Sequence, residues 1–259
     1  MSIPLAWFLV FCLGACIGSF LNVCISRLPE NESIVHPGSR CPFCRSPIRY
    51  SDNIPLLSFL WLKGRCRQCS AQISIRYPLI EALTGFMACF AVLKYGPTLP
   101  ALLYFIFIAA LITVTFIDID HRIIPDEISL GGIPLGLAAS FFLPGISLTD
   151  AMLGILAGGG ILLSVAKGYK LLTGNEGMGG GDIKLLAMIG AFIGWQGVFF
   201  TIFSASLIGT MIGLILMAVH GKNLKLAIPF GPFLSIGAII YIFLGQFIIH
   251  WYFFSSRIY

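Results

Sequence analysis

Long apolar runs dominate the sequence and restrict what the chain can fold into. A helix needs about 20 apolar residues to cross the hydrocarbon core of a bilayer. Only 10% of the 259 residues are charged, whereas an ordinary soluble domain contains about 25%. This excludes a soluble enzyme, a disordered chain and a disulfide-rich secreted domain. The sequence predicts an all-α polytopic membrane protein with about eight transmembrane helices, at residues 4–25, 78–96, 99–117, 127–144, 150–171, 183–194, 197–219 and 229–252.

The distribution of lysine and arginine favours eight helices over seven. Seven is the alternative because only residues 195–197 separate the sixth and seventh runs. With eight helices, fourteen basic residues (eight within 26–77 and six in later segments) lie on one side, and Lys94 and Arg257 lie on the other. Basic residues favour the cytoplasmic side. We therefore expect the N-terminus outside and residues 26–77 in the cytoplasm, and the net charge of +5 does not indicate a nucleic-acid partner.

The sequence predicts three parts: a first transmembrane helix at 1–25, a cytoplasmic domain at 26–77 and a membrane core at 78–259. Residues 26–77 stand out because they contain five of the 14 prolines and four of the eight cysteines. The other segments between the apolar runs are short. We expect residues 26–77 to be the part of the chain that folds outside the bilayer.

Four cysteines in this domain form two C-x2-C pairs, Cys41 with Cys44 and Cys66 with Cys69, separated by 21 residues. Two such pairs can complete a tetrahedral zinc site. The cytoplasm keeps thiols reduced, so we favour metal over disulfides. Free or redox-active thiols are the alternative. Because four protein ligands leave no open position, the predicted zinc is structural.

Three acidic residues flank the apolar runs on the side that we expect to be cytoplasmic. Asp118 and Asp120 follow the third run, and Asp182 precedes the sixth after a run of glycines that includes Gly179 and Gly181. A helix-capping role suits Asp182, but Asp118 follows a helix, where negative charge is disfavoured. The alternative is a pair of aspartates that share a water, one acting as base and the other as acid. The glycines would then let an extended peptide backbone approach closely.

Taken together, these motifs resemble the type IV prepilin peptidase family of bifunctional leader peptidases and N-methyltransferases. The resemblance covers nearly the whole chain, and its ordered motifs are the two cysteine pairs and residues 18–22 (GSFLN), 27–29 (RLP), 53–55 (NIP), 63–66 (KGRC), 76–81 (RYPLIE), 117–121 (IDIDH), 124–126 (IPD), 179–182 (GGGD) and 228–232 (IPFGP). It implies a GxGD-type intramembrane aspartyl protease core within 78–259. It also implies that the zinc domain at 26–77 is associated with methyl transfer.

The resemblance implies that Asp118 and Asp182 are catalytic, with Asp120, Gly179 and Gly181 in supporting roles. The implied substrates are type IV prepilins or type II secretion pseudopilins, cleaved just before their hydrophobic helix. The new amino terminus would then be methylated with S-adenosylmethionine as donor. The implied location is the bacterial inner membrane, with the active site at the cytoplasmic face of the lipid bilayer.

The sequence gives the weakest indication for the methyl-donor site. No dinucleotide-type glycine fingerprint is present, so we expect the donor near residues 63–65 or at Glu81, with Gly64 and Glu81 as candidate residues. An ion pair between Glu81 and Arg76 is the structural alternative. A leader peptidase without methyl transfer, a proton- or cation-coupled transporter that uses the two aspartates, and a purely structural membrane subunit are the alternative functions.

Overall fold

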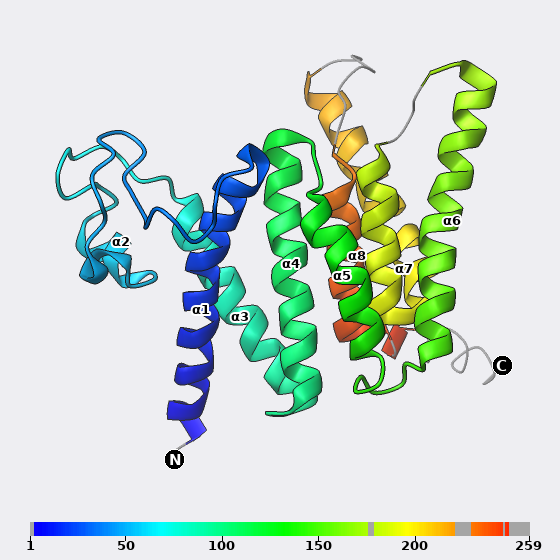
Figure 1. Ribbon diagram of the computed structural model, residues 1–259, viewed down its shortest axis with the longest axis horizontal. Coiled ribbons are helices and arrows are strands. Elements are labelled where there is room, and N and C mark those ends of the chain that lie inside the picture. Colours follow the sequence, from blue (N-terminus) through cyan, green and yellow to red (C-terminus); the bar gives the residue numbers. More distant parts are fainter. Residues whose placement is uncertain (1–2, 176–178, 221–228, 246, 249–259) are drawn as a thin grey trace. The chain divides into compact units, whose positions relative to one another are not determined.

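The computed structural model describes residues 3–175, 179–220, 229–245 and 247–248, and helices make up its regular structure (Figure 1). Apart from two isolated β-bridges, the described residues contain no β-structure. The predicted all-α class is therefore confirmed. The helices are α1 (Ile3–Arg27), η1 (Leu28–Glu30), η2 (Tyr50–Asn53), α2 (Leu57–Trp61), α3 (Arg76–Tyr95), α4 (Leu99–His121), α5 (Asp126–Ala139), α6 (Leu148–Thr173), α7 (Gly180–His220), α8 (Gly231–Ile240) and the π-helical turn η3 (Tyr241–Gly245).

Five of the described helices are long and apolar enough to cross a membrane: α1, α3, α4, α6 and α7. The predicted spans at 127–144 and 229–252 correspond to the shorter helices α5 and α8 with η3. The structure does not establish the exact number of eight spans. The chain divides into two compact units, Met1–Thr113 and Val114–Tyr259, and the boundary lies within α4.

The predicted sixth and seventh spans form one long helix, α7, with a break at Gly194. The backbone angles of Gly194 are φ 70° and ψ 176°, which are not helical. A positive φ is readily adopted only by glycine, so the break coincides with the residue that tolerates it. The break lies at the end of the predicted span 183–194, which explains why the sequence can be read as either one run or two.

In the first unit, α1 packs against α3 through glycines. A Cβ atom at Gly14 would lie 2.7 Å from the Ala88 Cβ, and one at Gly18 would lie 2.7 Å from the Cα of Glu81. Real Cβ atoms essentially never approach this closely, so the two backbones are in contact only because these side chains are absent. This is the small-residue packing expected between helices in lipid. It places Glu81 against the first helix.

In the second unit, glycine contacts join α7 to its neighbours. Gly154 of α6 lies against Gly190 of α7, and Gly158 lies against the backbone of Leu186. Gly158 is the first of three consecutive glycines in α6, at 158–160. Gly160 makes no such contact, because a Cβ atom there would have no neighbouring atom within 4 Å. A helix presents only one side to its partner, and Gly160 is on another side.

We expect Gly154→Ala to lower the stability of the second unit by about 1–3 kcal/mol, the usual cost of forcing extra atoms into a packed interface. The added methyl group would meet the Gly190 carbonyl. Gly160→Ala on the same helix is the matched control, because open space surrounds it. Thermal unfolding of both variants in one detergent measures the difference. Equal midpoints for the two variants would contradict the assigned interface.

Candidate active site and cysteine cluster

The four predicted cysteine ligands lie together in the structure, on two loops with the same local geometry. In the first loop, Cys41 N–H donates to the Ser46 carbonyl, and Arg45 N–H donates to the Cys41 carbonyl. The second loop repeats both bonds, from Cys66 to Ala71 and from Ser70 to Cys66, and the residues that follow the second cysteine of each pair have positive φ angles. The repeated bonds give both loops the same turn, here called a knuckle, and the two knuckles bring their sulfurs close to one point.

The sulfur positions fit a tetrahedral metal ion. All four Sγ atoms lie within 4.8 Å of one another, and the Sγ atoms of Cys41 and Cys69 are 3.8 Å apart. A tetrahedral site with Zn–S bonds of about 2.3 Å has sulfur–sulfur edges of about 3.8 Å. The cluster is therefore compatible with zinc, and its four sulfurs complete the coordination of such an ion.

The thiols of the cluster differ in acidity. The hydroxyl and backbone N–H of Ser46 lower the pKa of the Cys44 thiol to about 6. The backbone N–H of Ala71 lowers the pKa of the Cys69 thiol. Burial and the other cysteine sulfurs together outweigh this effect and raise the pKa to about 11. Four thiolates cannot readily share this space without a cation. A bound zinc ion would supply the charge that stabilises all four.

An ion pair next to the cluster joins the second knuckle to η2. The Arg67 guanidinium donates to both carboxylate oxygens of Asp52, at 2.8 and 2.6 Å. This two-point bond holds the pKa of Asp52 below its usual value. Two-point pairs fix orientation as well as distance. Asp52 therefore links the knuckle to the segment that precedes α2, which the sequence alone did not indicate.

Asp118 is a buried carboxylate near the end of α4. The helix continues to His121, beyond the predicted end at 117, so Asp118 lies inside the helix and is only 5% exposed. The backbone N–H of Gly231, at the start of α8, donates to Asp118 Oδ2 at 3.0 Å. A Cβ atom at Gly231 would lie 2.6 Å from the same oxygen. Only glycine leaves room for this carboxylate against the backbone.

Asp182 lies in the first turn of α7, and the structure brings it close to Asp118. Asp182 is half-buried, and the charge of Asp118 acts on it directly. Ile124 lies next to both Gly181, the neighbour of Asp182, and Gly231, the partner of Asp118, because Cβ atoms at these glycines would contact its side chain, at 3.0 and 3.3 Å. The segments that carry the two aspartates therefore meet at one apolar side chain.

The other acidic residues of this region lie at the surface. Asp120 is exposed. Asp126 accepts two bonds from Lys184 Nζ, at 2.7 and 2.9 Å, and so joins the start of α5 to α7 close to Asp182. The N-cap of α5 is Pro125, without a side-chain capping bond, and Asp126 is the first residue inside the helix.

The glycines before Asp182 leave its carboxylate accessible to a substrate. Gly179 and Gly180 are exposed, and a Cβ atom at Gly179 would meet only Asp182 Oδ2, at 4.0 Å. An extended peptide could therefore approach this carboxylate through backbone contacts. Two adjacent carboxylates beside an open backbone can activate a water and protonate a carbonyl oxygen.

The two candidate methyl-donor residues have structural partners. Gly64 has a φ of 66° and lies against the Phe59 ring, which a Cβ atom would approach to 3.1 Å. Glu81 is 9% exposed, accepts a bond from the Leu56 backbone N–H at 2.8 Å, and is also bonded to the Ser19 hydroxyl. Leu56 has a φ of 62°, which is uncommon for a residue with a side chain. Glu81 thus anchors an unusual turn between η2 and α2.

Two family models match the chain. The Bacterial Peptidase A24 N-terminal domain matches residues 12–95, and the Type IV leader peptidase family matches residues 105–214. The chain belongs to the type IV leader peptidase family. Curated members similar to this chain are named prepilin leader peptidase/N-methyltransferase. They include proteins of Aeromonas hydrophila (39% identical over 97% of this chain and 95% of the relative), Pseudomonas aeruginosa (38%, over 95% and 93%) and Legionella pneumophila (36%, over 95% of each).

No solved structure gives a significant match to this family member. The first family model lies within the first compact unit, and most of the second model lies within the second unit. Sequence reasoning missed two contacts at the candidate sites: the Gly231 bond to Asp118 and the Leu56 bond to Glu81. The first could have been suspected, because Gly231 lies between Phe230 and Pro232 in a motif that had no assigned role.

We expect the purified protein to contain one zinc ion per chain and to lose it on substitution of Cys69 by serine. A hydroxyl group is a poor substitute for a thiolate ligand of zinc, and the remaining sulfurs leave the tetrahedron incomplete. Cys12→Ser in α1 is the control, because this residue is not in the cluster. Elemental analysis after gel filtration measures the metal. Metal-free wild-type protein with four freely alkylated thiols would refute the site.

Proposed function

We propose that the chain is a bifunctional membrane enzyme that cleaves the leader peptide of type IV prepilins and N-methylates the new amino terminus. The observation that carries this proposal is similarity at 36–39% identity, over nearly the full length, to proteins named for both activities. The match includes the type IV leader peptidase model. The transporter and structural-subunit alternatives lose their support, because the two acids lie within a peptidase family's sequence. A peptidase without methyl transfer would leave the N-terminal domain unexplained.

Asp118 and Asp182 are the proposed catalytic pair. One carboxylate accepts a proton from the attacking water while the other donates a proton to the carbonyl oxygen of the scissile peptide. The Gly231 N–H orients the Asp118 carboxylate through Oδ2. The exposed backbone at Gly179 and the small Gly181 allow the substrate to approach Asp182. Asp120 has a supporting role and lies on the exposed side of α4, near the end that carries Asp118.

The proposed location is the bacterial inner membrane, with the N-terminus outside and the active site at the cytoplasmic face. The excess of basic residues in 26–77 and in the later segments on the same side supports this orientation. The exposed large apolar side chains of α1, α3 and α6, such as Leu13, Phe86 and Leu156, are suited to contact with the lipid bilayer. Pseudopilins of type II secretion systems are proposed as substrates beside the prepilins, because both present a basic leader before a hydrophobic helix.

The three parts of the chain are proposed to have separate roles. Residues 1–25 span the membrane, residues 26–77 carry structural zinc on Cys41, Cys44, Cys66 and Cys69, and residues 78–259 form the protease core. S-adenosylmethionine is the proposed methyl donor, and when bound it supplies an activated methyl group on a sulfonium. The protein has to hold a deprotonated amine in line with that methyl group, so positioning dominates this step. Gly64 and Glu81 contribute by shaping the 26–77 domain around the donor.

We expect Asp118→Asn and Asp182→Asn each to lower the rate of leader cleavage at least about a hundredfold, because acid–base catalysis alone contributes about 10²–10⁴. An amide cannot exchange the required proton. Mass spectrometry of a prepilin after incubation in detergent measures the product. Asp120→Asn is the matched control on the same helix end and should retain most activity. An active Asp118→Asn with an inactive Asp120→Asn would reverse the assignment within the pair.

Cleavage and methylation should be separable. Asp182→Asn should still methylate a pilin peptide that already lacks its leader, because this carboxylate has no part in positioning the donor. Gly64→Leu should lower methylation more than cleavage, since a side chain at φ 66° strains the turn against Phe59. Both products can be quantified by mass spectrometry in the same samples. Equal losses of both activities in every 26–77 variant would make this domain a general scaffold.

A further inference from the structure

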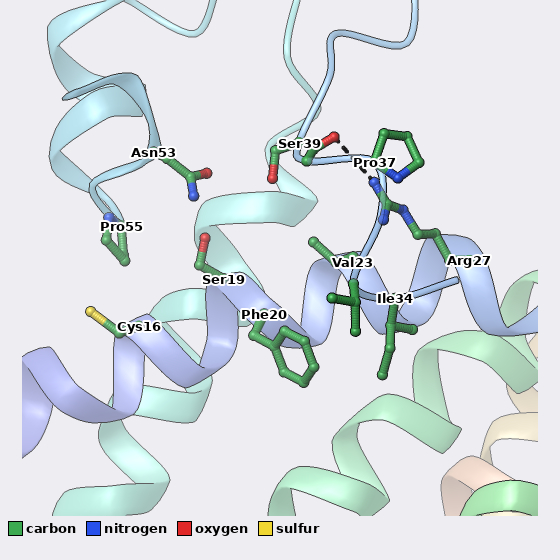
Figure 2. A pocket seen from close by; sticks show the side chains of 12 residues that line it. Cys16, Ser19, Phe20, Val23, Arg27, Ile34, Pro37, Ser39, Asn53 and Pro55 are labelled. Atoms are coloured by element: carbon green, nitrogen blue, oxygen red, sulfur yellow. Dashed lines mark hydrogen bonds between the residues drawn. The ribbon is translucent and has the colours of Figure 1, made fainter. Parts of the chain in front are cut away.

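A cavity of about 350 Å³ lies within the first unit, between α1 and two segments of the 26–77 domain (Figure 2). One wall is the face of α1 from Cys16 to Arg27, and the other walls are residues 34–39 and 53–55. The volume is in the range of about 300–1,000 Å³ typical of cofactor and small-molecule sites. The cysteine cluster, Asp118 and Asp182 are not among the residues that line it.

The lining combines an apolar body with a few polar groups. Phe20 and Val23 supply aromatic and aliphatic surface, and Figure 2 shows the Ser19 hydroxyl and the Asn53 amide on the cavity side. Arg27 is the only charged residue among those that line the cavity. A cavity with one guanidinium and no carboxylate favours a ligand with an anionic group.

Arg27 both builds the cavity and retains donors for a ligand. Its two terminal nitrogens donate to the carbonyls of Ser33 and Gly38, at 2.9 and 3.3 Å, which holds the segment 34–39 over α1. A guanidinium has five N–H groups, so two such bonds do not exhaust it. An α-carboxylate that enters the cavity would find a cation already held in place by the backbone.

Glu81 links the α1 wall of the same cavity to the wall formed by residues 53–55. Its carboxylate accepts from the Leu56 N–H, directly after the wall residue Pro55, and it is bonded to the hydroxyl of the wall residue Ser19. Glu81 does not line the cavity itself. It is therefore a positioning residue, and its place beside the cavity accounts for a buried acid in α3 that the protease chemistry does not use.

We propose that this cavity binds the methyl donor, S-adenosylmethionine, with its α-carboxylate at Arg27 and its adenosyl group between Phe20 and the polar groups of Ser19 and Asn53. This inference rests on the proposed methyltransferase function. In the reaction, the lone pair of the pilin amine forms the new N–C bond and the S–CH3 bond breaks. S-adenosylhomocysteine leaves, and the amine proton passes to water. The donor's positive sulfonium would meet no other cation than Arg27 among the lining residues.

The test measures binding of S-adenosylhomocysteine to the purified full chain by calorimetry. Val23→Trp should fill the cavity and weaken binding by about tenfold or more, the order expected for overfilling a fitted site. Leu13→Trp is the matched control, because it lies on α1, is 69% exposed and is not part of the lining. Its affinity should equal that of the wild type. Thermal midpoints of the two variants establish that both are folded.

A second measurement needs no substitution. Cys16 lines the cavity and is exposed, whereas Cys12, one turn earlier on α1, does not line it. S-adenosylhomocysteine should therefore slow the alkylation of Cys16 but not that of Cys12, as read by mass spectrometry of the labelled peptides. This result supports the proposal even if Val23→Trp does not fold.

The outcomes separate this inference from the function on which it rests. In one outcome, the wild-type protein binds S-adenosylhomocysteine and methylates, both tryptophan variants bind with equal affinity, and Cys16 is not protected. This result rules out the cavity as the donor site and leaves the methyltransferase function intact. Wild-type protein that cleaves but neither binds nor methylates overturns the methyltransferase function, and the cavity proposal with it. Protection of Cys16 by added phospholipid alone, unchanged by S-adenosylhomocysteine, assigns the cavity to lipid and overturns the proposal.

Discussion

Close contact between helix backbones is the constraint on which the rest of this structure depends. In lipid, apolar side chains gain little by leaving their surroundings for one another, so helices associate through tight packing at small residues. Gly14 and Gly18 allow it in the first unit, and Gly154 and Gly190 allow it in the second. A methyl group at any of these positions would separate the helices. At these contacts the chain uses glycine rather than a large apolar side chain.

The same close packing builds the candidate active site. Asp118 and Asp182 come from different helices. Gly231 leaves room for the Asp118 carboxylate against its backbone, and Gly181, the neighbour of Asp182, leaves room for Ile124. The ion pair of Lys184 with Asp126 holds the start of α5 to α7 at the same end. An exposed pair of this kind adds little stability, so its main effect is on position. The site is thus a product of helix ends and of the loops between them.

The 26–77 domain depends on bonds of another kind. It has few large buried side chains, and Cys41 is its only buried apolar residue among those described. A domain without a core needs cross-links, and the four-cysteine cluster, the Asp52–Arg67 pair and the Glu81–Leu56 bond supply them. Two of these are polar contacts to segments next to the cavity in the first unit. The shape of the 26–77 domain therefore follows from cross-links rather than from hydrophobic packing.

The sequence by itself determined the helical membrane class, the position of most helices and the set of four cysteines that cluster. These are local properties: apolar length decides whether a segment can span lipid, and the C-x2-C spacing decides whether a loop can present two sulfurs to one ion. The sequence also singled out Asp118 and Asp182, but it could not show that they are neighbours. It also divided residues 183–219 at 195–197, directly after the backbone break at Gly194, although apolar length alone did not show that the two runs continue as one helix with a kink.

Only the tertiary structure decided which partners each polar group has. The Gly231 N–H lies 113 residues from Asp118 in the sequence, and Leu56 lies 25 residues from Glu81. No local pattern encodes such bonds, since they depend on which helix ends meet after packing. The same is true of the three glycines at 158–160, which are equivalent in sequence but of which Gly158 contacts α7 and Gly160 does not. Composition and spacing determine what each segment can do, and the packing of glycine-bearing helices decides which segments act together.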